Sequence, residues 1–301
     1  MQDHAKPKMQ PPIAYQNGSF LETNRVSIPL QDAGFLWGAT VADRIRTFRG
    51  KLFRLEDHIA RFRENCERAY IHFPESDETL FEISHRLVNE NYDSHELSLT
   101  WLATPGISTG FASSDDMRIP TRIAYTQPIL PISYKKLLTD GATLITTPAS
   151  LGVDPSIKHR SRLAWWIAQQ GIRETDPRAE PLFVDLGSDA VLETPTANFL
   201  LVLDGTLTSP AKGTVLDGIS LKVVEELCAA MSIPFEQRRV LRGELKSASE
   251  AILTNTTYCL AGVARIDEHI FPHSRPMLSS LQSAWRALVE SDLMCEKSVQ
   301  R

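Results

Sequence analysis

A lysine in a basic, tryptophan-containing stretch is the first candidate for chemistry in this chain. Lys158 is followed by His159, Arg160 and Arg162. Apolar residues at helical spacing come next, and they predict an amphipathic helix (Leu163, Trp165, Trp166, Ile167). With residues 154–156 as loop and cap, Lys158 is expected in the first helical turn. Neighbouring positive charge and the helix dipole disfavour an ammonium ion there, so Lys158 could be a nucleophile; a solvated basic face is the alternative.

A carboxylate and a helix N-terminus that could bind an anion are the next candidate functional groups. Glu193 lies in a predicted turn between two strands, where a glutamate is usually solvated but could hold a protonated ring nitrogen if it faced a cleft. Gly218, Ile219 and Ser220 open a predicted helix, whose free N–H groups and dipole favour an anion. Most helices begin in a comparable way, so this second signal is weak by itself.

Hydroxyls and an arginine could complete a phosphate site. Thr256 and Thr257 follow a predicted strand, although threonines are common in strands for structural reasons. His58 and Arg61 lie three residues apart on one predicted helix, and arginine suits a phosphate dianion. A nucleophilic lysine, a carboxylate for a pyridinium and a phosphate cup are together what pyridoxal 5′-phosphate requires.

The elements that must position these residues indicate an α+β chain in two parts. Strands, two helices and further strands precede a proline-marked boundary near residue 128, and a second mixed α/β part follows. The predicted organisation is a flexible tail at 1–12, a small domain at 13–128, a linker at 129–134 and a larger domain at 135–301. Within the small domain, residues 40–48 predict a strand with Arg44 and Arg46 on one face.

Composition narrows the classes of function. The 301 residues carry a formal net charge of −5, and no basic stripe or bilayer-length apolar run is present, so neither nucleic acid nor a membrane is an expected partner. The four cysteines are scattered without a paired spacing, which predicts neither a zinc site nor a disulfide framework, and no metal. A reduced, cytoplasmic setting is the simplest expectation.

The chain resembles the fold-type IV (class IV) pyridoxal-phosphate enzymes. These include branched-chain aminotransferases, D-amino acid aminotransferases, R-selective amine transaminases and 4-amino-4-deoxychorismate lyases. The resemblance runs from about Tyr15 to Val289 and rests on segments that fall in family order and spacing (residues 17–18, 32–38 and 52–61, Lys158, Glu193 with Asn198, Gly218-Ile219, and residues 254–256). It implies a small N-terminal α/β domain and a larger C-terminal domain with a β-barrel-like sheet core.

The resemblance also implies roles for individual residues. Lys158 would form the Schiff base and shuttle the proton, Glu193 would pair the pyridine nitrogen, and Leu216 would pack on the ring. The phosphate would be bound by the remaining cofactor residues (Arg61, Gly218, Ile219, Ser220, Thr256, Thr257). Leu163 stands where branched-chain members have a tyrosine, and Asn255 stands where they have a glycine; both departures favour the lyase branch.

The substrate side departs further from the family. Ala42 replaces an aromatic residue of many relatives, which favours a bulkier substrate or a rearranged pocket, and Trp37 is a further substrate candidate. Arg44 and Arg46 could bind a substrate carboxylate; a salt bridge of Arg44 near Asp43 or Glu56 is the alternative. Thr104 is followed by Pro105 where the D-amino acid branch has an arginine, which disfavours that activity.

The predicted function is a ping-pong transaminase that moves an amino group between a branched-chain-like amino acid and a 2-oxo acid. A 4-amino-4-deoxychorismate lyase, which eliminates pyruvate, is the alternative, and a non-catalytic cofactor-binding homologue is a third possibility. The family's cleft lies close to a dimer partner, so the resemblance also implies a homodimer.

Overall fold

The computed structural model describes residues 11–108, 119–149 and 152–299, and it divides the chain into two compact units, Met1–Pro128 and Ile129–Arg301. Most of the tail predicted at 1–12 lies outside the described residues. In the linker predicted at 129–134, Pro131–Ser133 form a 3-10 helix. Both units mix helices with a sheet, as the α+β prediction requires. No helix in the described ranges is long and apolar enough to cross a membrane.

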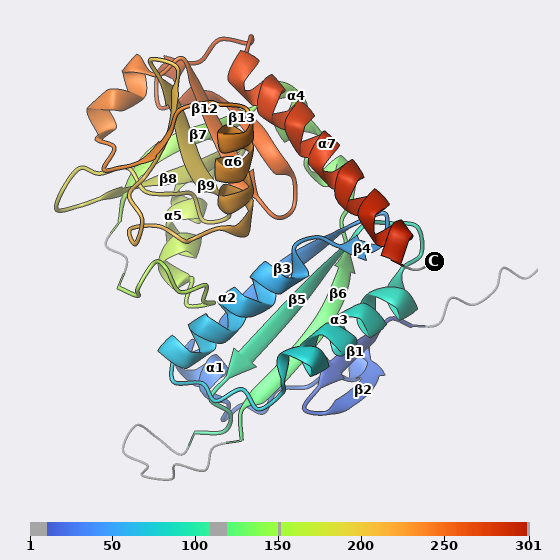
Figure 1. Ribbon diagram of the computed structural model, residues 1–301. Helices are drawn as coiled ribbons and strands as arrows, with labels where there is room; N and C mark the ends of the chain where they lie inside the picture. Colours follow the sequence, from blue (N-terminus) through green and yellow to red (C-terminus); the bar gives the residue numbers. More distant parts are fainter. Residues whose placement is uncertain (1–10, 109–118, 150–151, 300–301) are drawn as a thin grey trace, which may run out of the picture. The chain divides into compact units, whose positions relative to one another are not determined.

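The first unit is built on a six-stranded antiparallel sheet in the order β2-β1-β6-β5-β3-β4 (Figure 1). Asn17-Gly18 makes the tight turn of the first hairpin with both residues at positive φ, as an Asn-Gly turn requires. The strands are β1 (Ile13–Gln16), β2 (Ser19–Glu22), β3 (Val41–Phe48), β4 (Lys51–Leu52), β5 (Leu97–Thr104) and β6 (Thr121–Pro128).

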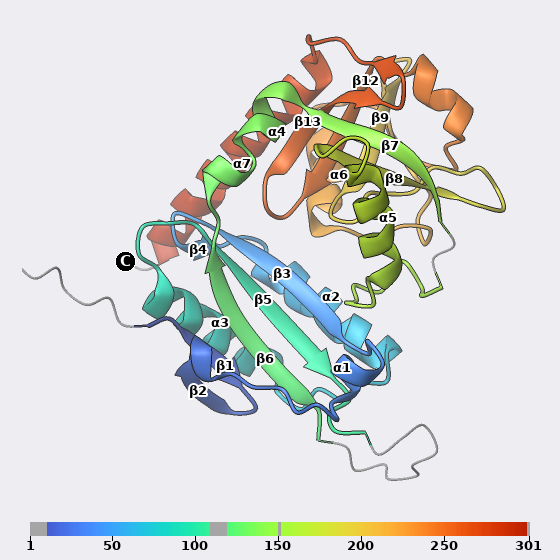
Figure 2. The same ribbon diagram turned by 180° about the vertical axis from the view of Figure 1, so that it is seen from behind.

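Two helices, α2 (Leu55–Arg68) and α3 (Asp77–Asn91), cover one face of this sheet, and Figure 2 shows the opposite face. Helix α3 is capped by Ser76, whose Oγ accepts from Thr79 N at 3.3 Å. A one-turn helix, α1 (Ala33–Leu36), has Asp32 as its N-cap, and the Asp32 carboxylate accepts from Gly34 N at 2.7 Å.

The second unit contains an eight-stranded mixed sheet in the order β11-β10-β9-β12-β13-β7-β8, with β14 paired to β13. The pairs β10/β11, β13/β7 and β7/β8 are parallel, and the others are antiparallel. The strands are β7 (Ala142–Ala149), β8 (Ala179–Asp185), β9 (Asn198–Leu203), β10 (Thr206–Ser209), β11 (Phe235–Gln237), β12 (Glu250–Asn255), β13 (Cys259–Ile266) and β14 (His269–Ile270).

A short segment connects the two ends of this sheet. Val191 forms a bridge with Val184 of β8, while its neighbour Ala190 forms a bridge with Leu241, which follows β11 along the chain. Val191 N also donates to Val240 O at 2.8 Å. We call residues 189–192 the seam. Because the seam pairs with both ends of the sheet, it curls the sheet toward a closed, barrel-like form, as the family resemblance implied.

Helices pack on the outside of this curled sheet. Helix α5 (Leu163–Arg173) packs on β8, and α6 (Ile219–Ala230) packs on β12, as seen in Figures 1 and 2. The long α7 (Pro276–Val299) packs on β12 and β13, and α4 (Lys135–Asp140) packs on β13. A 3-10 helix, Arg242–Ser247, follows the seam's partner segment, and a shorter one, Thr23–Arg25, follows the first hairpin.

Candidate functional site

Glu193, the carboxylate predicted to pair with a ring nitrogen, directly follows the seam. Its backbone is bonded to β8, because Phe183 N donates to Glu193 O at 3.0 Å. The next residues form a tight turn in which Thr194 Oγ1 accepts from Ala197 N at 3.0 Å. Glu193 is therefore held at the edge of the barrel-like sheet, with a backbone that is tied on both sides.

The carboxylate of Glu193 is buried and accepts two kinds of donor. Asn198 Nδ2 donates to Oε2 at 2.9 Å, and Leu216 N lies 3.3 Å from Oε1. Burial raises the pKa of Glu193 to about 7, although the bond from Leu216 N and the charges of Lys158 and Arg162 act in the opposite direction. A buried carboxylate that titrates near neutrality is suited to a cationic ligand group.

Asn198, the first residue of β9, connects Glu193 to the segment before the N-terminus of α6, where an anion site was predicted. Its Nδ2 also donates to Leu216 O at 2.8 Å. Gly218 is the N-cap of α6 and has no side-chain cap, and a Cβ atom there would lie 2.1 Å from Asn198 Oδ1. Ile219 and Ser220 occupy the first turn, where backbone N–H groups have no intrahelical acceptor. The amide of Asn198 thus requires a glycine at the N-terminus of α6, the helix end that was predicted to bind an anion.

The predicted hydroxyls lie in the turn between β12 and β13. Asn255 Oδ1 accepts from Thr257 N at 2.9 Å and from Tyr258 N at 3.1 Å, which organises the turn that carries Thr256. Asn255 Nδ2 donates to Thr196 O at 3.2 Å. The side chain of Asn255 therefore joins the hydroxyl turn to the turn that follows Glu193.

Lys158 does not lie where the sequence pattern placed it. Helix α5 begins at Leu163, so the prediction of Lys158 in a first helical turn is wrong, and the helix dipole gives no argument for its reactivity. The residues taken as a cap form a separate turn instead, in which Ser156 N donates to Asp154 Oδ1 at 3.0 Å. Lys158 is half-buried in an irregular segment, and its charge acts directly on Glu193.

The first unit buries a three-residue cluster around Asp43, which sequence reasoning missed as a functional residue. Arg61 Nε donates to Asp43 Oδ2 at 2.8 Å and Arg61 Nη2 donates to Oδ1 at 2.9 Å, while His58 Nδ1 lies 2.7 Å from Oδ1. Burial by itself would raise the pKa of Asp43, but Arg61 and His58 hold it well below its usual range. The predicted phosphate ligand Arg61 is thus oriented by a buried carboxylate.

The predicted substrate residues of the first unit have structural partners of their own. Asp43 faces α2, so the alternation along β3 puts Ala42, Arg44 and Arg46 on the other face of the sheet. Arg44 Nη2 donates to Ser98 Oγ at 2.8 Å. The guanidinium of Arg46 lies 4.0 Å from the Phe48 ring centroid.

Thr104 and Trp37 belong to the surroundings of α1. Thr104 Oγ1 donates to the buried Asp32 at 3.0 Å and accepts from Gly106 N at the same distance. Trp37 is the C-cap of α1, and its side chain is about half exposed. Buried Thr104 therefore supports the local fold, and both residues stay predictions as substrate contacts.

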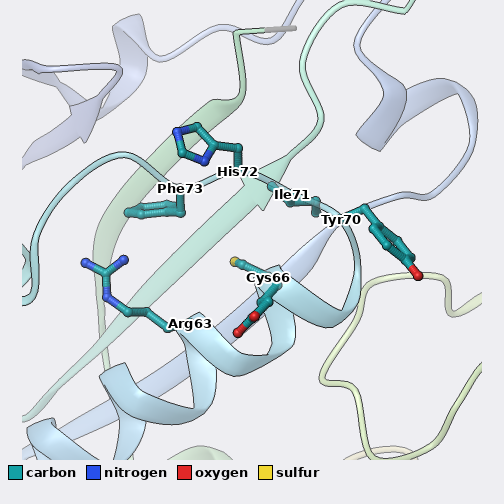
Figure 3. Close-up of a pocket in the computed structure, with 7 residues that line it drawn as sticks. Arg63, Cys66, Tyr70, Ile71, His72 and Phe73 are labelled. Atoms are coloured by element: carbon teal, nitrogen blue, oxygen red, sulfur yellow. The ribbon is translucent and has the colours of Figure 1, made fainter. Parts of the chain in front are cut away.

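A pocket of about 450 Å³ on the first unit contains none of the predicted site residues (Figure 3). It lies where α2 ends and the chain turns, and it is lined by Arg63, Cys66, Glu67 and residues 70–73. Burial raises the pKa of the Cys66 thiol to about 12, so this thiol is not a reactive nucleophile. We assign no chemistry to this pocket.

The donor set of the second unit fits pyridoxal 5′-phosphate. A primary amine (Lys158) acts electrostatically on a buried carboxylate (Glu193), and the carboxylate is bonded to the segment that leads into an uncapped helix N-terminus at Gly218. Threonine hydroxyls lie in a turn that is bonded to the turn following the carboxylate. An aldehyde, a pyridine nitrogen and a phosphate could each find a partner among these groups.

Known proteins are similar to this chain in sequence or in fold. A D-alanine aminotransferase of Staphylococcus aureus (strain N315) is 24% identical over 286 residues, which cover 92% of this chain and 98% of that protein. The branched-chain amino acid aminotransferase of Escherichia coli superposes with a TM-score of 0.85 at 17% identity, covering 93% and 95% of the two chains. The 4-amino-4-deoxychorismate lyase of Pseudomonas aeruginosa superposes with a TM-score of 0.76 at 23% identity, covering 91% and 98%.

A model of one protein family also matches most of the chain. Residues 40–266 match the family described as amino-transferase class IV, whose members depend on pyridoxal phosphate. The matched range contains Asp43, Arg61, Lys158, Glu193 and Gly218. The chain therefore belongs to the class IV aminotransferases.

Proposed function

We propose that this protein is a pyridoxal-phosphate-dependent transaminase that transfers an amino group between a branched-chain-like amino acid and a 2-oxo acid. The observation that carries the proposal is the placement of Glu193. Its carboxylate is buried and hydrogen-bonded to Asn198, and the charge of Lys158, from another segment, acts on it. Such a carboxylate needs a cationic partner, and the ring nitrogen of the cofactor provides one. When bound, the cofactor supplies an aldehyde for amines and a ring that withdraws electrons from the substrate α-carbon.

The residues of the second unit have separate tasks in this proposal. Glu193 keeps the ring nitrogen protonated, with Asn198 and Leu216 N orienting its two oxygens. The first-turn N–H groups of Ile219 and Ser220 bind the phosphate, together with the hydroxyls of Thr256 and Thr257. Leu216 would pack on the ring. Arg61 is proposed as a further phosphate ligand because the family resemblance implies it, and Asp43 maintains the orientation of its guanidinium.

Lys158 performs the proton transfer. With the cofactor bound, Lys158 Nζ would be the group that holds its aldehyde, and as a free amine it would take up and return the proton at the substrate α-carbon. The amino donor and the 2-oxo acid would occupy the site one after the other, which would give ping-pong kinetics.

Absorbance spectroscopy and a donor screen test this proposal. The purified protein should show a band at the edge of the visible range that bleaches when an amino donor is added. Lys158→Ala should abolish the band and lower kcat by at least roughly 10²-fold, because the proton then has no carrier. Lys246→Ala, which removes an exposed lysine of the same unit, is the matched control. A wild-type protein without the band, or an unchanged band in Lys158→Ala, would contradict the proposal.

The stereochemistry of the donor is tested in the same screen. L- and D-forms of leucine, valine and alanine should be compared with 2-oxoglutarate as acceptor. We expect L-branched-chain donors to give the highest kcat/KM, since Pro105 replaces the arginine that holds the carboxylate in the D-amino acid branch. A preference for D-alanine, the substrate named for the Staphylococcus aureus relative, would correct the donor and leave the transaminase proposal intact.

A lyase is the second candidate, and the residues after Lys158 favour it. His159, Arg162 and Leu163 match the lyase branch rather than the branched-chain pattern. In that reaction the same proton abstraction by Lys158 would lead to elimination of pyruvate. Pyruvate release from 4-amino-4-deoxychorismate, together with no transfer between any amino acid and oxo acid pair, would identify the lyase.

A further inference from the structure

Arg162 is a half-buried cation whose guanidinium is shared between two loops of the site. It directly precedes α5, and its Nε donates to His159 O at 3.3 Å within the segment that carries Lys158. Its Nη1 donates to Pro195 O at 2.9 Å, in the turn that follows Glu193. The guanidinium also lies 4.6 Å from the Trp165 ring centroid. One side chain thus connects the lysine segment to the glutamate turn.

Withdrawing an arginine from water in this way is costly. Desolvation lowers the pKa of Arg162 to about 10, with a further contribution from Arg160, while Glu193 acts in the opposite direction. A long apolar side chain could cover Trp165 without that cost. The presence of an arginine here therefore indicates that both the two N–H donors of its guanidinium and its positive charge are needed at this position.

We propose that Arg162 is a positioning residue that holds the Lys158 segment against the Glu193 turn and supplies a permanent positive charge to the Glu193 carboxylate. The proposal rests on the roles proposed above for Lys158 and Glu193. Lys158 is not part of a helix, and its segment is irregular, so side-chain bonds to that segment help to set where the amine lies. Removing Arg162 would leave His159 O and Pro195 O without these donors.

The positive charge of Arg162 stabilises the Glu193 carboxylate at stages of the catalytic cycle in which Lys158 is neutral. The groups whose charges act on Glu193 are Lys158 and Arg162, and those that act on Arg162 are Arg160 and Glu193; His159 faces both cations. Lys158 has to be neutral when it abstracts a proton. Arg162 remains charged at all working pH values, so it keeps Glu193 ionised while the lysine changes its charge.

Two substitutions at Arg162 separate its geometry from its charge. Arg162→Lys keeps a cation but cannot donate to both carbonyls through a fork, and Arg162→Met keeps the apolar contact with Trp165 but removes the charge. Arg160→Met removes an exposed positive charge from the same segment and is the matched control. Each variant is made in the full-length protein with Glu193 and again with Glu193→Gln, so that differences isolate the titration of Glu193.

The first measurement needs no bound cofactor. The full chain, stripped of cofactor, is unfolded with urea from pH 5 to pH 9, and the stability difference between each protein and its Glu193→Gln counterpart is followed. The pH at which half of this stability difference is lost should be roughly 1 unit higher in Arg162→Met, because the carboxylate loses a stabilising cation. Arg162→Lys should move it by less than half as much, and Arg160→Met should leave it unchanged. A purely structural role would lower stability equally at all pH values.

The second measurement is cofactor affinity, determined by titrating pyridoxal 5′-phosphate and following absorbance. By analogy with residues that orient metal ligands, we expect Arg162→Met to weaken binding by about 100-fold and Arg162→Lys by about 10-fold. An Arg162→Met protein that matches Arg160→Met in both measurements would overturn the proposal. That failure differs from a failure of the proposed function, in which Lys158→Ala of the otherwise wild-type protein keeps its visible band.

Discussion

Two buried carboxylates of this protein have opposite electrostatic environments. Asp43 has a bidentate arginine and a histidine as partners, and its pKa lies well below the usual range. Glu193 accepts from an amide and a backbone N–H, the charges of Lys158 and Arg162 act on it, and burial raises its pKa to about 7. Asp43 is therefore a satisfied structural anion, whereas Glu193 can still gain from a cationic ligand group.

The cofactor-free protein should lose stability as the pH rises past the pKa of Glu193. Its folded pKa of about 7 lies above the ordinary glutamate value of 4.5, so the folded protein holds the proton more tightly than the unfolded chain. The resulting stabilisation, up to about 3 kcal/mol, is present below pH 4.5 and is lost as the pH rises through 7. Urea unfolding of wild type and Glu193→Gln across this range should show the loss in wild type only. A constant difference between the two proteins would contradict it.

Replacing Asp43 should have a large effect that does not depend on catalysis. In Asp43→Asn the guanidinium of Arg61 stays buried without its carboxylate, so we expect a loss of about 3–5 kcal/mol in unfolding free energy. The control is Asp77→Asn, which removes an exposed partner of Arg63 and should cost no more than about 1 kcal/mol. Denaturant unfolding at pH 8 compares them, and equal losses would show that the Asp43 cluster is not tightly coupled.

Residue type and order in the sequence were sufficient to nominate Lys158, Glu193 and Arg61. They could not show that Asp43 orients Arg61 or that Arg162 is bonded to the turn after Glu193, because those bonds join residues 18 and 33 positions apart in the chain. A charged residue in the middle of a predicted strand, such as Asp43, was the available signal, since it has to find a partner if that face is buried.

At the level of elements, the start of α5 was the main error. Lys158 and the apolar residues after it share a helical period, but the chain becomes helical only at Leu163. Periodicity cannot locate a helix start when the preceding residues are bonded elsewhere, as Ser156 is to Asp154. The same pattern predicted an amphipathic helix, and three of its apolar residues, Leu163, Trp166 and Ile167, are 73%, 62% and 62% exposed. By contrast, α6 begins where its Gly-bearing turn predicted.

The N-terminus of α6 gives a prediction at this scale. In Gly218→Ala the new Cβ would meet Asn198 Oδ1 at 2.1 Å, so Asn198 has to move and its bonds to Glu193 and Leu216 weaken. We expect a loss of about 1–3 kcal/mol in stability and weaker cofactor binding. Gly243→Ala, where nothing lies within 4 Å of the added atom, should change stability by less than about 0.5 kcal/mol. Thermal unfolding and cofactor titration of both variants check this.

For the whole molecule, the exposed apolar side chains of α5 support the proposed homodimer. Apolar residues that gather on one helix face favour contact with another protein surface. We expect Trp166→Glu to raise the dimer dissociation constant by at least roughly 100-fold, because aromatic residues dominate such contacts. Ile270→Glu, at a side chain that is 74% exposed on β14, is the control. Sedimentation over a dilution series measures both, and a wild-type monomer at micromolar concentration would contradict the dimer.

The α+β class followed from the sequence because strand, helix and proline signals are local. The strand predicted at residues 40–48, for example, matches β3 (Val41–Phe48) to within one residue. The closure of the second sheet could not be foreseen from local patterns. It depends on the pairing of residues 190–191 with β8 and with residues 240–241, which are about 50 positions further along the chain.

That closure has a consequence for amide hydrogen exchange. Val191 N and Leu192 N are bonded to Val240 O and Phe183 O, and the residue after them is Glu193. Exchange at these two amides requires the barrel-like sheet to open where it is joined, and such an opening releases the backbone that holds the carboxylate. Their exchange rates should therefore fall when the site is filled, and they would report occupancy in real time, even with substrates that give no colour change.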